Sequence, residues 1–111
     1  MSLLRKLLGP HGEVREGGPE KWTPEDLARG APEWDALLVT SREQVTEEVI
    51  RAGSRLKIVA KFGVGVENID IPAATRAGIP VTNCPGSNAI AVAEAALALM
   101  LSTVRRIPPY M

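Results

Sequence analysis

The chain has 111 residues, with 13 basic and 13 acidic side chains, so its formal net charge is zero. This length suits one domain with a single core, and the neutral balance argues against a nucleic-acid surface, which needs a basic excess. A run of about 18 uncharged apolar residues, as a membrane helix requires, does not occur. The single cysteine rules out an internal disulfide and, without a signal peptide, predicts a reduced, cytoplasmic protein.

The first third of the chain predicts two short helices. Ser2–Leu8 has a helical pattern that a following Gly-Pro pair stops, and Gly12–Glu16 is a weak strand candidate. Thr23 begins the second helix, because a hydroxyl cap, a proline in the first turn and two acids at the positive end of the helix dipole follow one another there. Gly30 ends that helix.

From residue 35 onward the pattern alternates between strand and helix, which favours a parallel α/β sheet with flanking helices. Asp35–Thr40 (DALLVT) is an apolar run typical of a buried parallel strand. The other predicted strands are Leu56–Ala60, whose ends are made polar by lysines, and Pro80–Asn83. The helices between the strands are predicted at Thr46–Ala52 and Ile71–Ala77, each followed by glycine.

Ala89–Arg105 is predicted as one long helix whose apolar side chains cover nearly its whole circumference. Such a helix has to be buried on all sides, and one small domain rarely covers more than one face. Glu94 and the limited length argue against a membrane span. We therefore expect a second body against this helix, either another domain or another subunit, and we expect the chain to form a homo-oligomer through it.

The segment Lys61–Asn68 (KFGVGVEN) follows a predicted strand and allows three interpretations. As a dinucleotide fingerprint it lacks the third glycine, which Asn68 replaces, and also the acid about 20 residues later. As a tight turn it needs only the conformational freedom of glycine. As an anion site, its successive N–H groups form a concavity for a carboxylate, at the strand end where open α/β sheets bind ligands.

The segment Asn83–Asn88 (NCPGSN) leads into the long helix. Its Pro-Gly pair predicts a turn, and Ser87 or Asn88 can cap the helix. Asn88 and the helix N-terminus are also expected to face the same cleft as the preceding segment. Cys84 has no basic neighbour in sequence to activate its thiol, so we interpret it as a small buried residue.

Together, the motifs GVGVxNID, AATRAGIPVxNxPGxN and VAE resemble, in order and spacing, the D-isomer-specific 2-hydroxyacid dehydrogenase family, nearest to its phosphoglycerate dehydrogenases. The resemblance is close over residues 55–108 and looser from Asp35. It implies an oxidoreductase that interconverts D-2-hydroxy and 2-keto acids, with 3-phosphoglycerate among the candidate substrates. The cofactor it implies is NAD, with NADP as the alternative. The resemblance also implies that the active-site cleft lies between a flavodoxin-like substrate domain and a Rossmann domain.

The resemblance also implies roles for individual residues. The backbone at Val64 and Gly65 would hold the substrate carboxylate, and Asn88 and Ser41 would border the substrate. Val92 would lie against the nicotinamide. No metal site is expected.

On the same basis, residues 1–88 would form part of a substrate domain and residues 89–111 an interdomain helix. The first strand of the sheet and the Rossmann domain would be absent, together with the family's catalytic arginine, acid and histidine. His11 is the only histidine and is expected to be solvated. We therefore expect these residues alone to be inactive. The alternatives are a non-catalytic module that binds a small acid or a protein, and a receiver-like domain, which would need clustered acids.

Several positions depart from the family pattern. Thr40 replaces an arginine that phosphoglycerate-type members often carry, and nearby Arg42 is either a surface charge or a contact for an anionic substrate tail. Glu67 replaces aspartate, with an expected structural role, and Ala95 replaces a histidine. Glu94 would be costly inside an apolar helix unless paired, so we expect it to contact a cation or a backbone donor.

Overall fold

Three parallel strands form the centre of the protein, which is described here by a computed structural model covering residues 3–108. The strands β1 (Ala36–Val39), β2 (Ile58–Lys61) and β3 (Val81–Thr82) pair in the order β1-β2-β3. Ala36 lies opposite Ile58, and Val39 lies opposite Lys61. The predicted parallel α/β sheet is thereby confirmed. The predicted helix start at Ser2 and residues 109–111 lie outside the described residues.

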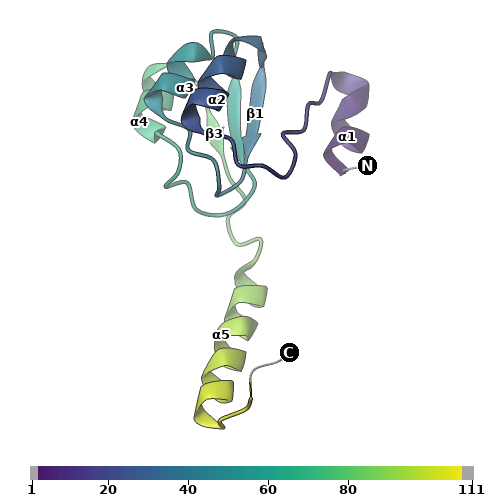
Figure 1. Ribbon diagram of the computed structural model, residues 1–111, viewed down its shortest axis with the longest axis vertical. Coiled ribbons are helices and arrows are strands. Elements are labelled where there is room, and N and C mark those ends of the chain that lie inside the picture. Colours follow the sequence, from purple (N-terminus) through teal and green to yellow (C-terminus); the bar gives the residue numbers. More distant parts are fainter. Residues whose placement is uncertain (1–2, 109–111) are drawn as a thin grey trace.

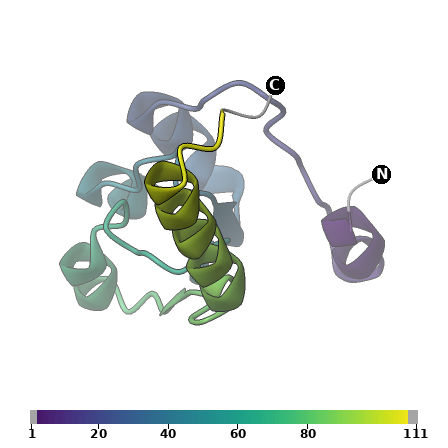
Figure 2. The same cartoon turned by 90° about the horizontal axis from the view of Figure 1, so that it is seen from below.

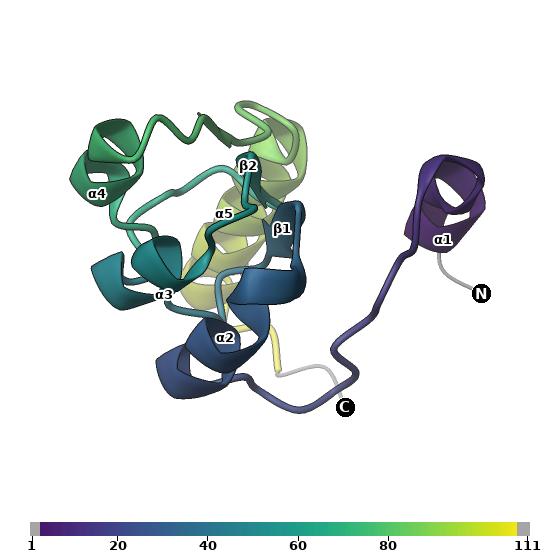
Figure 3. The same cartoon turned by 90° about the horizontal axis from the view of Figure 1, so that it is seen from above.

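The helices α2 (Pro24–Gly30), α3 (Glu47–Ala52) and α4 (Ile71–Arg76) cover one face of this sheet (Figures 1 and 3). Strand order advances in one direction, and crossovers between parallel strands are right-handed, so the connecting helices fall on the same face. No strand precedes β1 within residues 3–108, and one edge of β1 is therefore unpaired there.

Side-chain caps fix where the helices of the body begin. Thr23 and Asp26 form a reciprocal capping box at α2: Asp26 N–H donates to Thr23 Oγ1 at 3.2 Å, and Thr23 N–H donates to Asp26 Oδ2 at 3.0 Å. Thr46 accepts from the backbone of Val49 at α3. The predicted caps at Thr23 and Thr46 are confirmed, and each such cap contributes about 1 kcal/mol.

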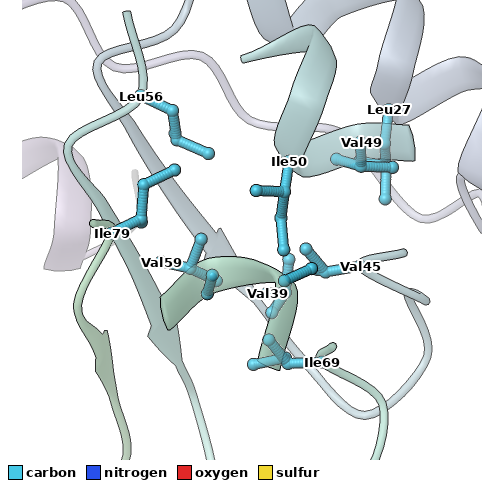
Figure 4. Close-up of a cluster of buried hydrophobic side chains, with 11 residues drawn as sticks. Leu27, Val39, Val45, Val49, Ile50, Leu56, Val59, Ile69 and Ile79 are labelled. Atoms are coloured by element: carbon cyan, nitrogen blue, oxygen red, sulfur yellow. The ribbon is translucent and has the colours of Figure 1, made fainter. Parts of the chain in front are cut away.

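The core lies between the sheet and the three helices (Figure 4). Its side chains come from β1, β2, the three helices and the loops between them: Leu27, Val39, Val45, Val49, Ile50, Leu56, Val59, Ile69, Ala73, Ala74 and Ile79. The opposite face of the sheet has no such cover, and Leu38 is 42% exposed. The prediction that Asp35–Thr40 is a buried strand therefore holds for one face only within the described residues, because all three helices lie on the same side.

The N-terminal helix α1 (Leu3–Leu8) and the 3-10 turn Gly9–His11 stand apart from the body (Figure 1). The weak strand candidate Gly12–Glu16 is wrong, because this stretch forms no strand pairing and connects α1 to the body as an irregular segment. Arg15 in it forms ion pairs with Glu13 and Glu33. His11 is exposed, as predicted.

Helix α5 (Ala89–Val104) extends away from the carboxyl edge of the sheet (Figure 1), and in the view from below it projects toward the viewer in front of the body (Figure 2). None of its residues is buried within the described chain, and Ile90 is 77% exposed. Glu94 forms no hydrogen bond or ion pair with residues 3–108, so its predicted contact is not found there. Among these residues, no helix is long and apolar enough to cross a membrane.

Candidate active site

Three loops meet at the carboxyl edge of the sheet, where parallel strands direct their ligand-binding loops. Residues 40–46 follow β1, residues 62–70 follow β2 and residues 83–88 follow β3. Ser41 lies in the first loop, Val64 and Gly65 lie in the second, and Asn88 ends the third. These predicted substrate-binding residues therefore lie on neighbouring loops of one edge, between the sheet and α5 (Figure 1).

In the turn at residues 63–66, three of the four carbonyl groups accept hydrogen bonds, whereas the amide groups donate none within the described residues. The carbonyl of Gly63 accepts from Cys84 N–H at 2.8 Å, and the carbonyl of Val64 accepts from Asn83 Nδ2 at 2.8 Å. The N–H groups of residues 63–66 donate to no acceptor within the described chain. Successive unpaired N–H groups in a loop are a setting for anion binding.

Two glycines shape this turn. Gly63 has φ 149°, a backbone conformation that side chains disfavour. A Cβ atom at Gly65 would meet the carboxylate of Glu67, so a larger residue there requires this exposed side chain to turn away. Glu67, for which a structural role was expected, is exposed and places its negative charge next to the turn.

A buried polar pair holds the first two loops together. Lys61 Nζ donates to Asn68 Oδ1 at 2.6 Å, and Asn68 Nδ2 donates to the carbonyls of Thr40 at 2.9 Å and Glu43 at 2.6 Å. Val45 and Ile69 add a parallel bridge between the same loops. Sequence reasoning missed this pair, because a lysine at the end of a strand resembles a solvated charge. The residue that could have indicated the pair is Asn68, because it occupies the position at which a dinucleotide fingerprint has its third glycine.

The first loop has its own hydrogen bonds. Glu43 Oε2 accepts from the backbone N–H of Thr40 at 3.1 Å and from its hydroxyl at 2.7 Å. Burial alone would raise the pKa of Glu43, but the hydrogen bonds from Thr40 outweigh it and hold that pKa below its usual value. Arg42 is exposed and donates to the carbonyl of Pro19 at 3.0 Å, in agreement with the surface-charge interpretation. Ser41 is exposed beside it.

The third loop is more open than expected. Cys84, predicted to be buried, is exposed, because no other element packs over this loop in the described chain, and its Sγ lies 3.9 Å from the carbonyl of Lys61. Asn88 is the N-cap residue of α5, but neither it nor Ser87 caps the helix through a side-chain hydrogen bond. Val92 lies one turn further along α5, where its side chain is exposed.

The ionisable side chains at this edge include those of Glu43, Lys61, Glu67, Asp70 and Cys84, and the single histidine does not lie among them. His11 lies in the turn after α1, away from the three loops (Figure 1). Within residues 3–108, no three side chains of histidine, cysteine, aspartate or glutamate lie close enough together to form a metal site. What the described residues offer at the carboxyl edge of the sheet is a turn of unpaired N–H groups.

Comparison with known proteins identifies the family. The model of the D-isomer specific 2-hydroxyacid dehydrogenase catalytic domain matches residues 3–105. The chain belongs to this family. The resemblance inferred from the motifs is therefore confirmed.

Individual family members are similar over most of the chain. It is 57% identical to a D-3-phosphoglycerate dehydrogenase of Synechocystis over 77 residues, which cover 69% of this chain and 14% of that protein. It is 46% identical to a hydroxypyruvate reductase of Thermotoga maritima, covering 86% of this chain and 31% of that protein. The chain thus spans less than a third of the length of either dehydrogenase.

A solved structure shares the fold. The NAD+-bound 3-phosphoglycerate dehydrogenase of Entamoeba histolytica superimposes with a TM-score of 0.71 and 30% sequence identity. The match covers 89% of this chain and 32% of that protein. The parallel α/β arrangement predicted for this chain is therefore one that a dehydrogenase of the family adopts.

Proposed function

We propose that this chain is the substrate-binding part of an NAD-dependent oxidoreductase that interconverts a D-2-hydroxy acid and a 2-keto acid. The observation that carries the proposal is the turn at residues 63–66, whose N–H groups are free within the described residues while three of its four carbonyl groups accept hydrogen bonds. In this proposal the N–H groups of Val64 and Gly65 bind the substrate carboxylate. Asn88 and Ser41, on the two flanking loops, border the rest of the substrate.

The residues of this chain would contribute binding and orientation. Hydrogen bonds from N–H groups to a carboxylate are charge-assisted, and hence shorter and stronger than bonds between neutral groups. Fixing the carboxylate restricts the position of the adjacent hydroxyl or keto carbon, which lowers the entropic part of the barrier. Gly65 has no side chain, so it leaves the turn open to close approach by the carboxylate.

The nicotinamide cofactor, when bound, supplies the hydride acceptor or donor for this chemistry. The described residues would form only a small part of the binding site for this cofactor. The segment Lys61–Asn68 lacks the third glycine of a phosphate-binding fingerprint, and Asn68 is instead engaged with Lys61. Val92, exposed on the first turns of α5, is the one apolar side chain that we assign to the nicotinamide. NAD is the proposed cofactor and NADP the alternative.

The finer proposal for the substrate is 3-phosphoglycerate. Its support is the similarity to relatives named D-3-phosphoglycerate dehydrogenase. Arg42 is the one basic side chain in residues 40–46, although it is engaged with Pro19. A small acid without a phosphate, such as the substrate named for the Thermotoga relative, would need no such contact.

We further propose that two segments of the chain have different roles. Residues 1–88 would form the substrate-binding unit, and residues 89–111 would form a helix that packs against a second domain or subunit. These 111 residues would not catalyse the reaction alone, since the reduction of a ketone needs a proton donor. The sole histidine, His11, lies away from the three loops.

Binding of D-lactate tests the proposed function. We expect the backbone amide resonances of Val64 and Gly65 in the 15N-labelled chain to shift on titration with sodium D-lactate and to stay unchanged with sodium chloride at matched ionic strength. Shifts confined to other parts of the chain would refute the carboxylate turn. An NADH-dependent assay with hydroxypyruvate on the product of the full reading frame then separates the enzyme from a non-catalytic module of the same fold.

A further inference from the structure

Lys61 is a buried charge without an acidic partner. Its side chain lies at the end of β2, with the residue only 2% exposed. Within residues 3–108 the ammonium makes one hydrogen bond, to the neutral Oδ1 of Asn68, and takes part in no ion pair. Because an ammonium carries three N–H donors, two remain unused there. A buried charge is costly unless a charge of opposite sign accompanies it.

The acids of the neighbouring loops are engaged elsewhere. The carboxylate of Glu43 accepts both of its hydrogen bonds from Thr40. Asp70 accepts from the backbone N–H of Ala73 and caps α4. Glu67 is exposed and lies against Gly65. None of these three supplies the counter-ion that the Lys61 ammonium lacks.

The side chain of Lys61 lies directly against the turn with the free N–H groups. Its Cε atom is 3.2 Å from the position that a Cβ atom on Gly63 would occupy. Its partner Asn68 closes the same loop, so lysine and asparagine stand at the two ends of the segment that contains the turn. A negative ligand on the turn would therefore bind close to an uncompensated positive charge in a poorly solvated setting, where charge interactions are strong.

We propose that the positively charged ammonium of Lys61 attracts the carboxylate of the bound acid to the turn at residues 63–66, and that this carboxylate is the counter-ion of Lys61. This inference rests on the proposed function and adds the group that selects anions. Backbone N–H groups donate hydrogen bonds to neutral as well as to charged oxygen atoms, and a buried ammonium adds a further preference for the charged one. Lys61 is thus a residue that determines specificity for acids over their neutral analogues.

A matched pair of ligands and a matched pair of lysines test this proposal. D-lactate and D-lactamide have nearly the same shape, but only D-lactate carries a charge. Lys61→Met removes the buried ammonium and keeps an apolar stem, Lys61→Arg keeps the charge, and Lys57→Met removes an exposed lysine just before the same strand. Dissociation constants come from the amide shifts of Val64 and Gly65 in the 111-residue chain.

The unaltered chain is expected to bind D-lactate at least about tenfold more tightly than D-lactamide, which corresponds to about 1.4 kcal/mol. In Lys61→Met this preference should disappear through weaker binding of D-lactate alone, while Lys61→Arg and Lys57→Met keep it. A Lys61→Met chain that retains the preference overturns the inference and leaves the turn intact as a binding site. An unaltered chain that shows no shift at Val64 and Gly65 overturns the proposed function itself.

Lys61→Met also leaves Asn68 Oδ1 without its donor, so the variant can lose its fold. A measurement on the unaltered chain covers this case. The 15N resonance of the Lys61 ammonium should shift with D-lactate and stay in place with D-lactamide, while that of Lys57 stays in place with both. A Lys61 resonance that D-lactate leaves unmoved would count against the inference irrespective of any variant.

Discussion

The α/β body and helix α5 carry similar apolar residues in very different surroundings. In the body, Val45, Val49 and Val59 are fully buried between the sheet and its helices. In α5, Ile90 is 77% exposed and Val104 is 78% exposed. Burial of apolar surface is the dominant favourable term in folding. The body therefore supplies the stability of this chain, whereas α5 offers surface that can be buried only by something outside it.

The largest expected effect is on the free energy of unfolding, and it compares the substitution of isoleucine by alanine on α3 in the body with the same substitution on α5. Ile50 on α3 is 3% exposed, so Ile50→Ala should lower the free energy of unfolding by about 2–5 kcal/mol. Ile90→Ala on α5 removes an exposed side chain and should change it by less than about 0.5 kcal/mol. Urea denaturation followed by circular dichroism measures both. Equal losses would show that α5 packs against the body in solution.

The second prediction concerns what covers α5. Because Leu97 and Leu101 lie one turn apart on the exposed helix, we expect copies of the chain to associate through this surface. The double substitution Leu97→Glu and Leu101→Glu should reduce the molar mass by light scattering to that of a monomer. The matched control is Glu94→Gln, which keeps the apolar surface and should keep the assembly. A monomeric unaltered chain would refute this proposed interface.

Features that depend on residues close together in the chain could be predicted from the sequence. Helix starts at Thr23 and Thr46 are encoded locally, because a hydroxyl cap and the N–H group that it accepts from lie three residues apart. Strand Asp35–Thr40 was predicted from its run of apolar residues, and the structure has β1 at Ala36–Val39. Elements that depend on near neighbours in the chain were therefore predicted well.

Features that depend on distant contacts were not predicted. Lys61 is buried because Asn68 reaches Thr40 and Glu43, more than 20 residues away, and closes the loops over it. Cys84 is exposed because no element packs over its loop within residues 3–108. The residue type alone could not indicate this. For the candidate site, the sequence indicated the loops and the turn, but not which N–H groups are free.

A third pair of substitutions compares the N-termini of α2 and α5. Thr23 takes part in both hydrogen bonds of its capping box, so Thr23→Ala should cost about 1 kcal/mol of stability. Asn88 holds the same position in α5 without a side-chain capping bond, and Asn88→Ala should change stability by less than about 0.5 kcal/mol. Urea midpoints at constant pH measure both. A large loss from Asn88→Ala would mean that its side chain caps α5 in solution.

The smallest expected effect is a dependence of the stability on pH, and we expect it to come from the body and not from α5. Hydrogen bonds from Thr40 hold the pKa of Glu43 below its usual value despite burial. A carboxyl group with a lowered pKa in the folded state stabilises the fold above its unfolded pKa of about 4.3, and this contribution is lost as the pH falls through the folded value. Glu43→Gln should therefore flatten the loss of stability below that pH, whereas Glu94→Gln on α5 should leave it unchanged.

Urea midpoints between about pH 2 and pH 6 give the slopes that decide this prediction, because the slope reports the difference in bound protons between the folded and unfolded states. Parallel curves for Glu43→Gln and the unaltered chain would mean that the Thr40 contacts do not hold the carboxylate in solution. A flattened curve for Glu94→Gln would mean instead that Glu94 gains a partner when α5 is covered. That result would place the missing contact of Glu94 in the same assembly that Leu97 and Leu101 are expected to form.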